Sequence, residues 1–366
     1  MTWRVGILGA TGAVGQKMIQ GLSDHPWFRI TEVAASERSA GKSYAEAVRW
    51  MQNSAIPPGV ADLEVKPVQP GLECDFVLSA LDSSVAGPVE EEFARAGYPV
   101  ISNCRNHRMD EDVPLVIPEV NPDHLDLIPW QKERRGFSTG YLVTNPNCST
   151  VGLALALKPL DDAFGVEEVF VVTMQALSGA GYPGVPSLDA LDNVIPYIGG
   201  EEEKMQTEPR KILGRLVRHS VEFAALKLSA HCNRVPVLDG HLESVTVRLK
   251  SKASAEAVSE ALSRFSGEPQ RLGLPTAPEH PILVSEEADR PQPRRDRDAG
   301  KGMSISVGRI RPCSIADFKF TVLVHNTVRG AAGAAILNAE LLADRGLLPH
   351  RDRVEVNDGV VAEEQV

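Results

Sequence analysis

The chain has 366 residues, of which 43% are hydrophobic and 24% charged, as in ordinary globular proteins, and its length exceeds what one hydrophobic core usually serves, so two domains are expected. The 38 basic and 49 acidic residues leave a net charge of -11, which argues against a general nucleic-acid-binding surface. The five cysteines are scattered without disulfide or metal-ligand spacing, and no leader pattern or long apolar run occurs, so we expect a cytoplasmic protein with no metal site and no membrane partner.

The first residues follow the order strand, glycine turn, helix. An apolar run at 3–8 precedes Gly9-Ala10-Thr11-Gly12-Ala13-Val14-Gly15, and apolar positions then recur at helical spacing over 16–22. Glycines in such a turn let backbone N–H groups approach a pyrophosphate, and the helix N-terminus adds partial positive charge. The spacing is GxxGxxG instead of GxGxxG, so an ordinary strand-to-helix turn is the alternative. The pattern predicts a dinucleotide site at Gly9, Thr11, Gly12, Ala13 and Val14.

The end of the next predicted strand, residues 30–35, indicates which dinucleotide binds. An acidic residue at this place usually binds the ribose 2'-hydroxyl of NAD, whereas Ser36 and Arg38 suit a 2'-phosphate. Glu37 lies between them, and a solvated turn is the alternative. We expect NADP(H), contacted by Ser36 and Arg38.

Strand-like runs at 76–80 and 98–102 flank a helical stretch at 85–96. This alternation predicts a parallel sheet with right-handed crossovers. Because ligands bind at the carboxyl ends of strands in open α/β sheets, we expect Ser79 and Ala80 beside the cofactor. Arg108 follows the second strand in a basic loop, where it could bind an oxyanion, although such a loop is more often a solvated patch.

The segment 142–153 is the most informative in the chain. It combines a short apolar run, the turn Asn145-Pro146-Asn147, and Cys148 at the point where the pattern becomes helical. The positive end of a helix dipole favours a thiolate, so Cys148 is interpreted as a nucleophile. A buried cysteine that packs as a small hydrophobe is the alternative.

From residue 166 onward, apolar and polar residues alternate in strand-like runs at 168–174 and 244–249. Alternation of this kind predicts an α+β domain with a mostly antiparallel sheet. The alanine-rich helix expected at 331–342 could pack back on the first domain. We expect the acidic stretch from Pro349 to form a tail. The fold class is therefore α/β, a Rossmann-type parallel-sheet domain followed by the α+β domain.

Three further polar residues stand at expected ends of strands. Gln175 precedes a glycine-dense loop and could hold an acyl oxygen, with a long β-turn as the alternative. Arg234 could bind a carboxylate. His241 follows a tight turn and suits proton exchange near neutral pH, although a lone histidine is more often structural.

Five segments, in this order along the chain, together resemble aspartate-semialdehyde dehydrogenase of the archaeal and fungal type. They are residues 9–12, 145–150, 178–184, 232–241 and 325–333, and the match runs from residue 4 to about 345. The resemblance implies that Cys148 is the acyl-accepting nucleophile, that His241 is the general acid/base and that Gln175 orients the acyl group. It also implies domains at 1–148, joined by a C-terminal helix at about 327–350, for NADP and at 149–326 for catalysis and dimerisation.

The resemblance further implies how substrate and cofactor are held. The implied substrate contacts are Arg234 for the α-carboxylate, Glu201 for the ammonium group, and Arg108, Asn147 and Lys204 for phosphate. The implied cofactor contacts are Ser178, Gly179 and Asn326, with Asn326 near the nicotinamide. The implied reaction is the NADPH-dependent reductive dephosphorylation of L-aspartyl 4-phosphate to L-aspartate 4-semialdehyde through a cysteine thioester. It belongs to the biosynthesis of lysine, diaminopimelate, threonine and methionine, in a homodimer or homotetramer.

Other functions remain open at this point. A malonyl-CoA reductase, or another acyl-CoA or acyl-phosphate reductase such as N-acetyl-glutamyl-phosphate reductase, would use the same thioester chemistry. Glu201 argues against malonate, which carries no ammonium group. An NADP-binding regulator without catalytic activity is the remote alternative, and the joint presence of Cys148, Gln175 and His241 argues against it.

Overall fold

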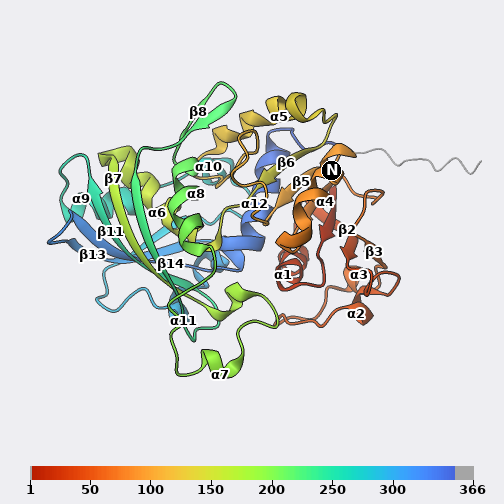
Figure 1. The fold of residues 1–366 in the computed structure, drawn as a ribbon, viewed down its shortest axis with the longest axis horizontal. Coiled ribbons are helices and arrows are strands. Elements are labelled where there is room, and N and C mark those ends of the chain that lie inside the picture. The colour runs from red at the N-terminus through yellow and green to blue at the C-terminus, as the bar shows by residue number, and fades with distance from the viewer. Residues whose placement is uncertain (1, 351–366) are drawn as a thin grey trace, which may run out of the picture.

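The computed structural model describes residues 2–350. Two six-stranded sheets lie side by side, one formed by the first part of the chain and one by the later part (Figure 1). The strands of the first sheet are β1 (Trp3–Leu8), β2 (Phe28–Ala35), β3 (Val65–Pro67), β4 (Phe76–Ser79), β5 (Pro99–Ser102) and β6 (Tyr141–Thr144). Those of the second sheet are β7 (Val166–Gln175), β10 (Lys227–Arg234), β11 (His241–Leu249), β12 (Ile282–Ser285), β13 (Ile305–Pro312) and β14 (Phe318–Val324).

Helices connect the strands, and a small hairpin pairs β8 (Arg215–Val217) with β9 (Ser220–Glu222). The α-helices are α1 (Ala13–Leu22), α2 (Tyr44–Ala47), α3 (Pro58–Ala61), α4 (Ser83–Arg95), α5 (Ile128–Arg135), α6 (Cys148–Phe164), α7 (Ser187–Ala190), α8 (Glu201–Ile212), α9 (Ala255–Ser263), α10 (Glu268–Leu272), α11 (Pro293–Asp296) and α12 (Gly333–Asp344). The other helical turns are η1 (Pro122–Leu127), η2 (Leu177–Ala180), η3 (Ala299–Gly302) and η4 (Val328–Ala332). No helix within residues 2–350 is long and apolar enough to cross a membrane.

The first sheet has the strand order β3-β2-β1-β4-β5-β6, and every neighbouring pair is parallel. This confirms the predicted Rossmann-type sheet. The order reverses between β1 and β4, and in such sheets ligands bind in the crevice at the reversal. The glycine turn after β1 therefore lies where a dinucleotide is expected.

The second sheet has the order β10-β7-β11-β14-β13-β12. Its three central pairs are antiparallel, and the pairs at its two edges, β10 with β7 and β12 with β13, are parallel. The prediction of a mostly antiparallel sheet is confirmed. Strand β11 shows the alternation that predicted it, with every second residue from His241 buried.

Helix α6 joins the two halves of the molecule. It begins shortly after β6 of the first sheet, and its residues from Ser149 to Leu157 are all buried as it packs on the second sheet. A Cβ atom on Gly152 would lie 2.9 Å from a side-chain atom of Val324 in β14. The small residue lets the helix approach the strand closely, which fixes the height of the helix N-terminus above the sheet.

Helix α12 returns to the first sheet, as the alanine-rich pattern predicts, and Ile336 meets Gly21 of α1. It begins at Gly333, two residues later than expected, because residues 328–332 form a π-helical turn. We propose on this basis that residues 327–350 belong with residues 1–148, and that 149–326 form the second domain. The tail expected from Pro349 lies outside the described residues from position 351 onward.

Candidate active site

The N-terminus of α6 presents Cys148 as its first residue. The side-chain oxygen of Asn147 accepts hydrogen bonds from the backbone N–H groups of Ser149 and Thr150, at 3.0 and 3.3 Å. This cap starts the helix where the sequence predicts it. A Cβ on Gly330 would lie 2.7 Å from that of Cys148, so the backbone of η4 packs directly against the cysteine.

Cys148 and His241 come together from 93 residues apart in the chain. Sγ of Cys148 lies 3.2 Å from Nε2 of His241, which is the first residue of β11 and is fully buried. The other ring nitrogen, Nδ1, accepts a hydrogen bond of 3.0 Å from the backbone N–H of Ala176. Cys148 keeps part of its surface open to solvent. The arrangement is that of a nucleophile beside a proton-exchanging group.

Burial shifts the pKa values of both members of this pair. It raises the pKa of the Cys148 thiol to about 12 and lowers the pKa of His241 to about 3. Both shifts favour the neutral form of the group, so burial opposes the thiolate that the helix N-terminus and the nearby cations favour.

Glu201 lies at the centre of a buried polar cluster beside Cys148. Its carboxylate accepts hydrogen bonds from Asn147 Nδ2 at 2.8 Å, Gln175 Nε2 at 3.2 Å and Lys204 Nζ at 2.5 Å. Burial acts to raise the pKa of Glu201, but Lys204 and the hydrogen bonds from Asn147 and Gln175 more than offset it, so the pKa is lowered. The structure thus gathers three of the predicted site residues around the carboxylate of a fourth.

Arg108 is buried, and the solvated-patch alternative does not apply to it. Its Nη1 pairs with Glu208 at 2.9 Å, and its Nη2 donates to the carbonyl of Asn103 at 2.7 Å. The other carboxylate oxygen of Glu208 accepts the backbone N–H of Asn147 at 2.6 Å. Glu208 therefore connects Arg108 to the residue that caps the nucleophile helix.

Arg234, Ser178 and Asn326 line the other side of His241. Arg234, which is 6% exposed, donates from Nη1 to the carbonyl of Ala176 at 2.7 Å. Asn326 donates to the hydroxyl of Ser178 at 2.8 Å and accepts the backbone N–H of Gly240 at 2.8 Å. These bonds tie the loop before His241 to the loop after β14.

The glycine turn has the geometry that close approach requires. Gly9 has φ +77°, and a Cβ there would lie 2.5 Å from the carbonyl oxygen of Ala80. Helix α1 begins at Ala13, and its first N–H groups are free of intrahelical partners, as at any helix start. At the end of β2, Ser36 and Arg38 are exposed.

At one predicted cofactor contact, Ser79, the side chain does not face the crevice. The side chain of Ser79 is fully buried, and its hydroxyl donates to Glu90 at 2.5 Å. Glu90 also accepts the hydroxyl of Ser102 at 2.6 Å. The strand pattern placed Ser79 at the crevice, but the alternation of side chains turns it into the interior, and only Ala80 is partly exposed.

Comparisons with known proteins agree with this architecture. Residues 4–128 match the family model "Semialdehyde dehydrogenase, NAD binding domain", and residues 157–329 match "Semialdehyde dehydrogenase, dimerisation domain". The aspartate-semialdehyde dehydrogenase of Archaeoglobus fulgidus is 56% identical over 343 residues, which are 93% of this chain and 98% of that protein. That of Schizosaccharomyces pombe is 50% identical, over 94% of this chain and 99% of its own.

The chain belongs to the aspartate-semialdehyde dehydrogenase family. A crystal structure of the family member from Candida albicans with NADP superposes with a TM-score of 0.87 at 43% identity, covering 95% of this chain and 100% of that one. Membership of the aspartate-semialdehyde dehydrogenase family, expected from the five motif segments, is confirmed.

Sequence reasoning missed two groups in this aspartate-semialdehyde dehydrogenase site. Glu208 lies seven residues after Glu201 on α8, and helical periodicity puts both on one face, so the spacing could have identified it. The N–H of Ala176 belongs to the backbone, and no residue pattern signals its direction.

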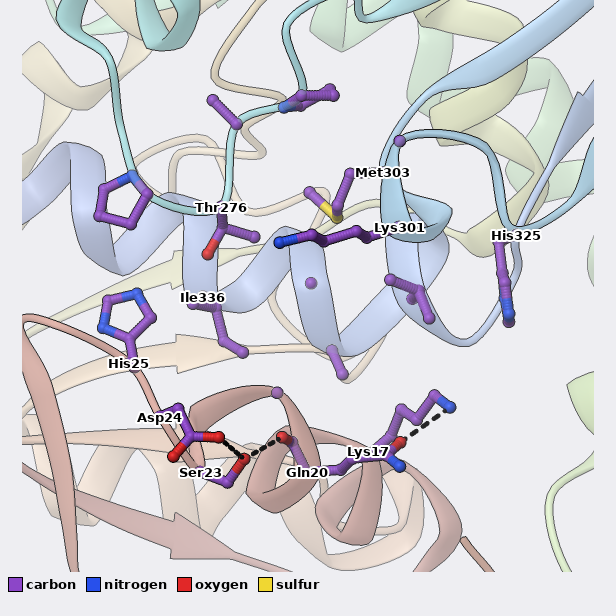
Figure 2. Close-up of a pocket in the computed structure, with 18 of the residues that line it drawn as sticks. Lys17, Gln20, Ser23, Asp24, His25, Thr276, Lys301, Met303, His325 and Ile336 are labelled. Atoms are coloured by element: carbon purple, nitrogen blue, oxygen red, sulfur yellow. Dashed lines mark hydrogen bonds between the residues drawn. The ribbon is translucent and has the colours of Figure 1, made fainter. Parts of the chain in front are cut away.

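A separate cavity of about 840 Å³ lies between α1, α12 and the loop around Lys301 (Figure 2). Lys17 approaches it from α1, Lys301 from η3, and Met303 and Ile336 line its apolar part. None of the predicted site residues borders it. In this aspartate-semialdehyde dehydrogenase family member, the reactive groups therefore converge at the N-terminus of α6 and not in this cavity.

Proposed function

We propose that the protein catalyses the NADPH-dependent reductive dephosphorylation of L-aspartyl 4-phosphate to L-aspartate 4-semialdehyde. The observation that carries the proposal is the 3.2 Å pair of Cys148 Sγ and His241 Nε2 at the N-terminus of α6, next to the carboxylate of Glu201. The names of the relatives from A. fulgidus and S. pombe support the same activity.

In the first step, the sulfur of Cys148 attacks the carbonyl carbon of the acyl phosphate. The S–C bond forms, the C–O bond to phosphate breaks, and the thiol proton leaves with the phosphate. Arg108, Lys204 and Asn147 are the groups proposed to receive the phosphate. The cations among them also offset the burial that keeps the thiol protonated, since Arg108 and Lys204 both act to lower the pKa of Cys148.

NADPH, when bound, supplies a hydride to the acyl carbon. Its pyrophosphate would be held by the turn of Gly9, Thr11 and Gly12 and by the first amides of α1, at Ala13 and Val14, because these amides have no intrahelical partner. The exposed Ser36 and Arg38 suit the 2'-phosphate. The C. albicans relative solved with NADP supports this choice of cofactor.

The tetrahedral oxyanion at the Cys148 thioester collapses to the aldehyde and releases the thiolate. Backbone N–H groups at the start of α6 and the amide of Gln175 are the proposed donors to this oxygen. His241 is in position to serve the sulfur and the acyl oxygen as general acid/base. Ser178, Gly179 and Asn326, next to His241, are proposed to border the nicotinamide.

The charges around Cys148 favour an amino-acid substrate. We assign the α-carboxylate to Arg234 and the ammonium group to Glu201. The pKa of Glu201 is lowered, because Lys204 and the hydrogen bonds to its carboxylate overcome its burial, so it carries a negative charge for the ammonium. Malonyl-CoA has no ammonium group, and the same charge would then face an uncharged methylene. This difference favours aspartyl phosphate over malonyl-CoA.

The match to a dimerisation domain at residues 157–329 supports a homo-oligomer. We propose a homodimer or a dimer of dimers formed through the second domain. Sedimentation of the purified protein tests this, since a monomer at micromolar concentration would contradict it.

The decisive assay is NADPH oxidation with aspartyl phosphate and with malonyl-CoA, side by side. We expect turnover with aspartyl phosphate, and none above background with malonyl-CoA. Cys148→Ser should lower turnover by a factor of about 10⁴ or more, because the hydroxyl is a far poorer nucleophile without a strong base. Cys313→Ser, a change remote from the site, is the matched control. Turnover in Cys148→Ser near the wild-type rate would exclude the thioester route.

A further inference from the structure

A buried lysine of α8, which takes no part in the reaction steps above, holds the loop that carries Arg108. Lys211 is 1% exposed, and its Nζ donates to the backbone carbonyls of Arg108, Asp110 and Val113 at 2.7, 2.7 and 2.8 Å. We infer that Lys211 is a positioning residue for the phosphate group, acting by fixing the backbone from Arg108 to Val113. The inference rests on the proposed function, in which Arg108 receives the phosphate.

The ammonium group of Lys211 matches this set of acceptors. It carries three N–H donors and no acceptor, so three carbonyls satisfy it completely. Burial lowers the pKa of Lys211 to about 8, while Asp110, Asp112 and Glu208 act to raise it, so the group stays mostly protonated at about pH 7. Because a buried charge is costly without partners, the lysine and the loop hold each other in one arrangement.

The loop depends on such side-chain bonds, because residues 103–113 form no helix or strand. His107 pairs with Asp110 at 2.9 Å, and Arg135 pairs with Asp110 at 2.8 Å and with Asp112 at 2.6 Å. These pairs anchor residues 107–112 through their side chains. Lys211, in contrast, binds the carbonyl of Arg108 itself, so it restrains the residue proposed to meet the phosphate most directly.

Helix α8 fixes Arg108 through the side chain as well as through the backbone. Glu208, three residues before Lys211 and on the same face of the helix, pairs with Nη1 of Arg108 at 2.9 Å. Nε of Arg108 is buried and has no hydrogen-bond partner among residues 2–350, which leaves a donor for an oxyanion. The guanidinium also acts on Cys148, whose pKa it lowers. Since a small misplacement of a binding group weakens catalysis strongly, the hold of Lys211 on the loop should matter for phosphate.

The first test uses the reverse reaction, in which phosphate attacks the thioester formed from L-aspartate 4-semialdehyde and NADP. Lys211→Met keeps the length of the side chain and removes its donors. The KM for phosphate should rise about tenfold, while kcat and the KM for the semialdehyde change by less than about threefold. Arg210→Met, an exposed position on the same helix, is the matched control and should behave as the wild type. An unchanged KM for phosphate in Lys211→Met would overturn the inference.

A double variant shows whether Lys211 acts through Arg108. Arg108→Met should raise the KM for phosphate by itself. Adding Lys211→Met to it should change that KM by less than about twofold, because the guanidinium that Lys211 positions is already absent. If the two effects multiply instead, Lys211 acts by another route and the inference fails. A loss of folded protein would lower the measured kcat and leave the KM unchanged, so it cannot imitate the expected result.

Hydrogen exchange examines the loop without substrate. Amide hydrogens within 103–113 should exchange about tenfold faster in Lys211→Met than in the wild type and in Arg210→Met. Equal rates would overturn the inference whatever the substrate is. Faster exchange in an enzyme whose wild type does not react with the semialdehyde and phosphate would contradict the proposed function, while supporting the hold of Lys211 on the loop.

Lys211→Gln replaces Lys211→Met if the latter does not fold. The shorter amide keeps two donors and loses at least one of the three bonds. The KM for phosphate should then rise about threefold or more, with faster exchange in the same loop. A folded Lys211→Gln with the wild-type KM and exchange rates would overturn the inference.

Discussion

At Cys148, two opposing effects act on the charge of one sulfur atom. The helix N-terminus and the cations Arg108, Lys204 and Arg234 favour the thiolate, whereas burial and the carboxylate of Glu201 favour the thiol. Burial is the largest effect, and it holds the pKa at about 12. Burial thus opposes ionisation of the resting sulfur, and we expect a bound substrate to change the balance of charge around it.

Removing the negative charge of Glu201 should make Cys148 more reactive even as it harms turnover. Glu201 raises the pKa of Cys148, so Glu201→Gln should lower that pKa and enlarge the thiolate fraction at about pH 8. Alkylation by iodoacetamide should accelerate about tenfold for each unit by which the pKa falls. Turnover with aspartyl phosphate should fall at the same time, because the proposed ammonium partner is lost.

The matched control is Glu203→Gln, which removes the same charge from an exposed position on the same helix. Its alkylation rate should equal that of the wild type. Equal alkylation rates for Glu201→Gln and wild type would show that Glu201 does not influence the sulfur.

At the scale of elements, the turn between β1 and α1 requires glycine for two reasons, its backbone conformation and its close contacts. Gly9 is in the left-handed region, and Gly15 brings α1 so near to the turn that a Cβ there would lie 2.3 Å from the carbonyl of Gly9. The glycines therefore permit both the turn and the seating of the helix on the sheet. This packing, and not only the approach of a ligand, explains their spacing.

Gly9→Ala should weaken NADPH binding strongly, and Gly41→Ala separates the causes. Both glycines have positive φ, but a Cβ at Gly41 meets nothing within 4 Å, whereas one at Gly9 meets Ala80 at 2.5 Å. Gly41→Ala should lower the free energy of unfolding by about 1–2 kcal/mol, the backbone strain alone. Gly9→Ala should lower the free energy of unfolding further, and its affinity for NADPH should fall about tenfold or more because the turn shifts. Titration by fluorescence and unfolding in urea measure the two effects; equal losses in both variants would contradict the close-contact argument.

At the scale of the whole molecule, a buried ion pair joins the segment before α12 to the first half of the chain. Arg329 of η4 pairs with Glu119 at 2.6 Å, and both side chains are almost completely buried. Gly267, just before α10, packs against Glu119, where a Cβ would lie 2.6 Å from its Cα. Because η4 also packs on Cys148, this pair connects the stability of the molecule with the position of the nucleophile.

Arg329→Met should destabilise the protein by about 3–5 kcal/mol, because it leaves the charge of Glu119 buried without a partner. Arg264→Met, which breaks a largely exposed pair with Glu260, should lose no more than about 0.5 kcal/mol. Urea unfolding of both variants, with turnover measured on the folded fraction, checks this. A loss in Arg329→Met as small as that in Arg264→Met would mean that the pair does not hold the halves together.

Local chemistry made several features predictable from the sequence. The glycine turn, the helix start at Cys148 after Asn147, and the alternating residues of β11 are each decided by neighbours a few residues away. The order of strands and helices then predicts a parallel sheet followed by an α+β domain. Family membership followed from five short segments whose residues and order are specific.

Only the tertiary structure decides which distant segments make contact and which side chains become buried. His241 reaches Cys148 across 93 residues, Glu208 bonds Arg108 across 100, and the amide of Ala176 finds His241 across 65. Burial, which no single segment encodes, raises the pKa of the Cys148 thiol and encloses the side chain of Ser79. Residue type and spacing determine which groups are available, whereas their ionisation depends on how much water the packed chain excludes, and that is a property of the whole fold.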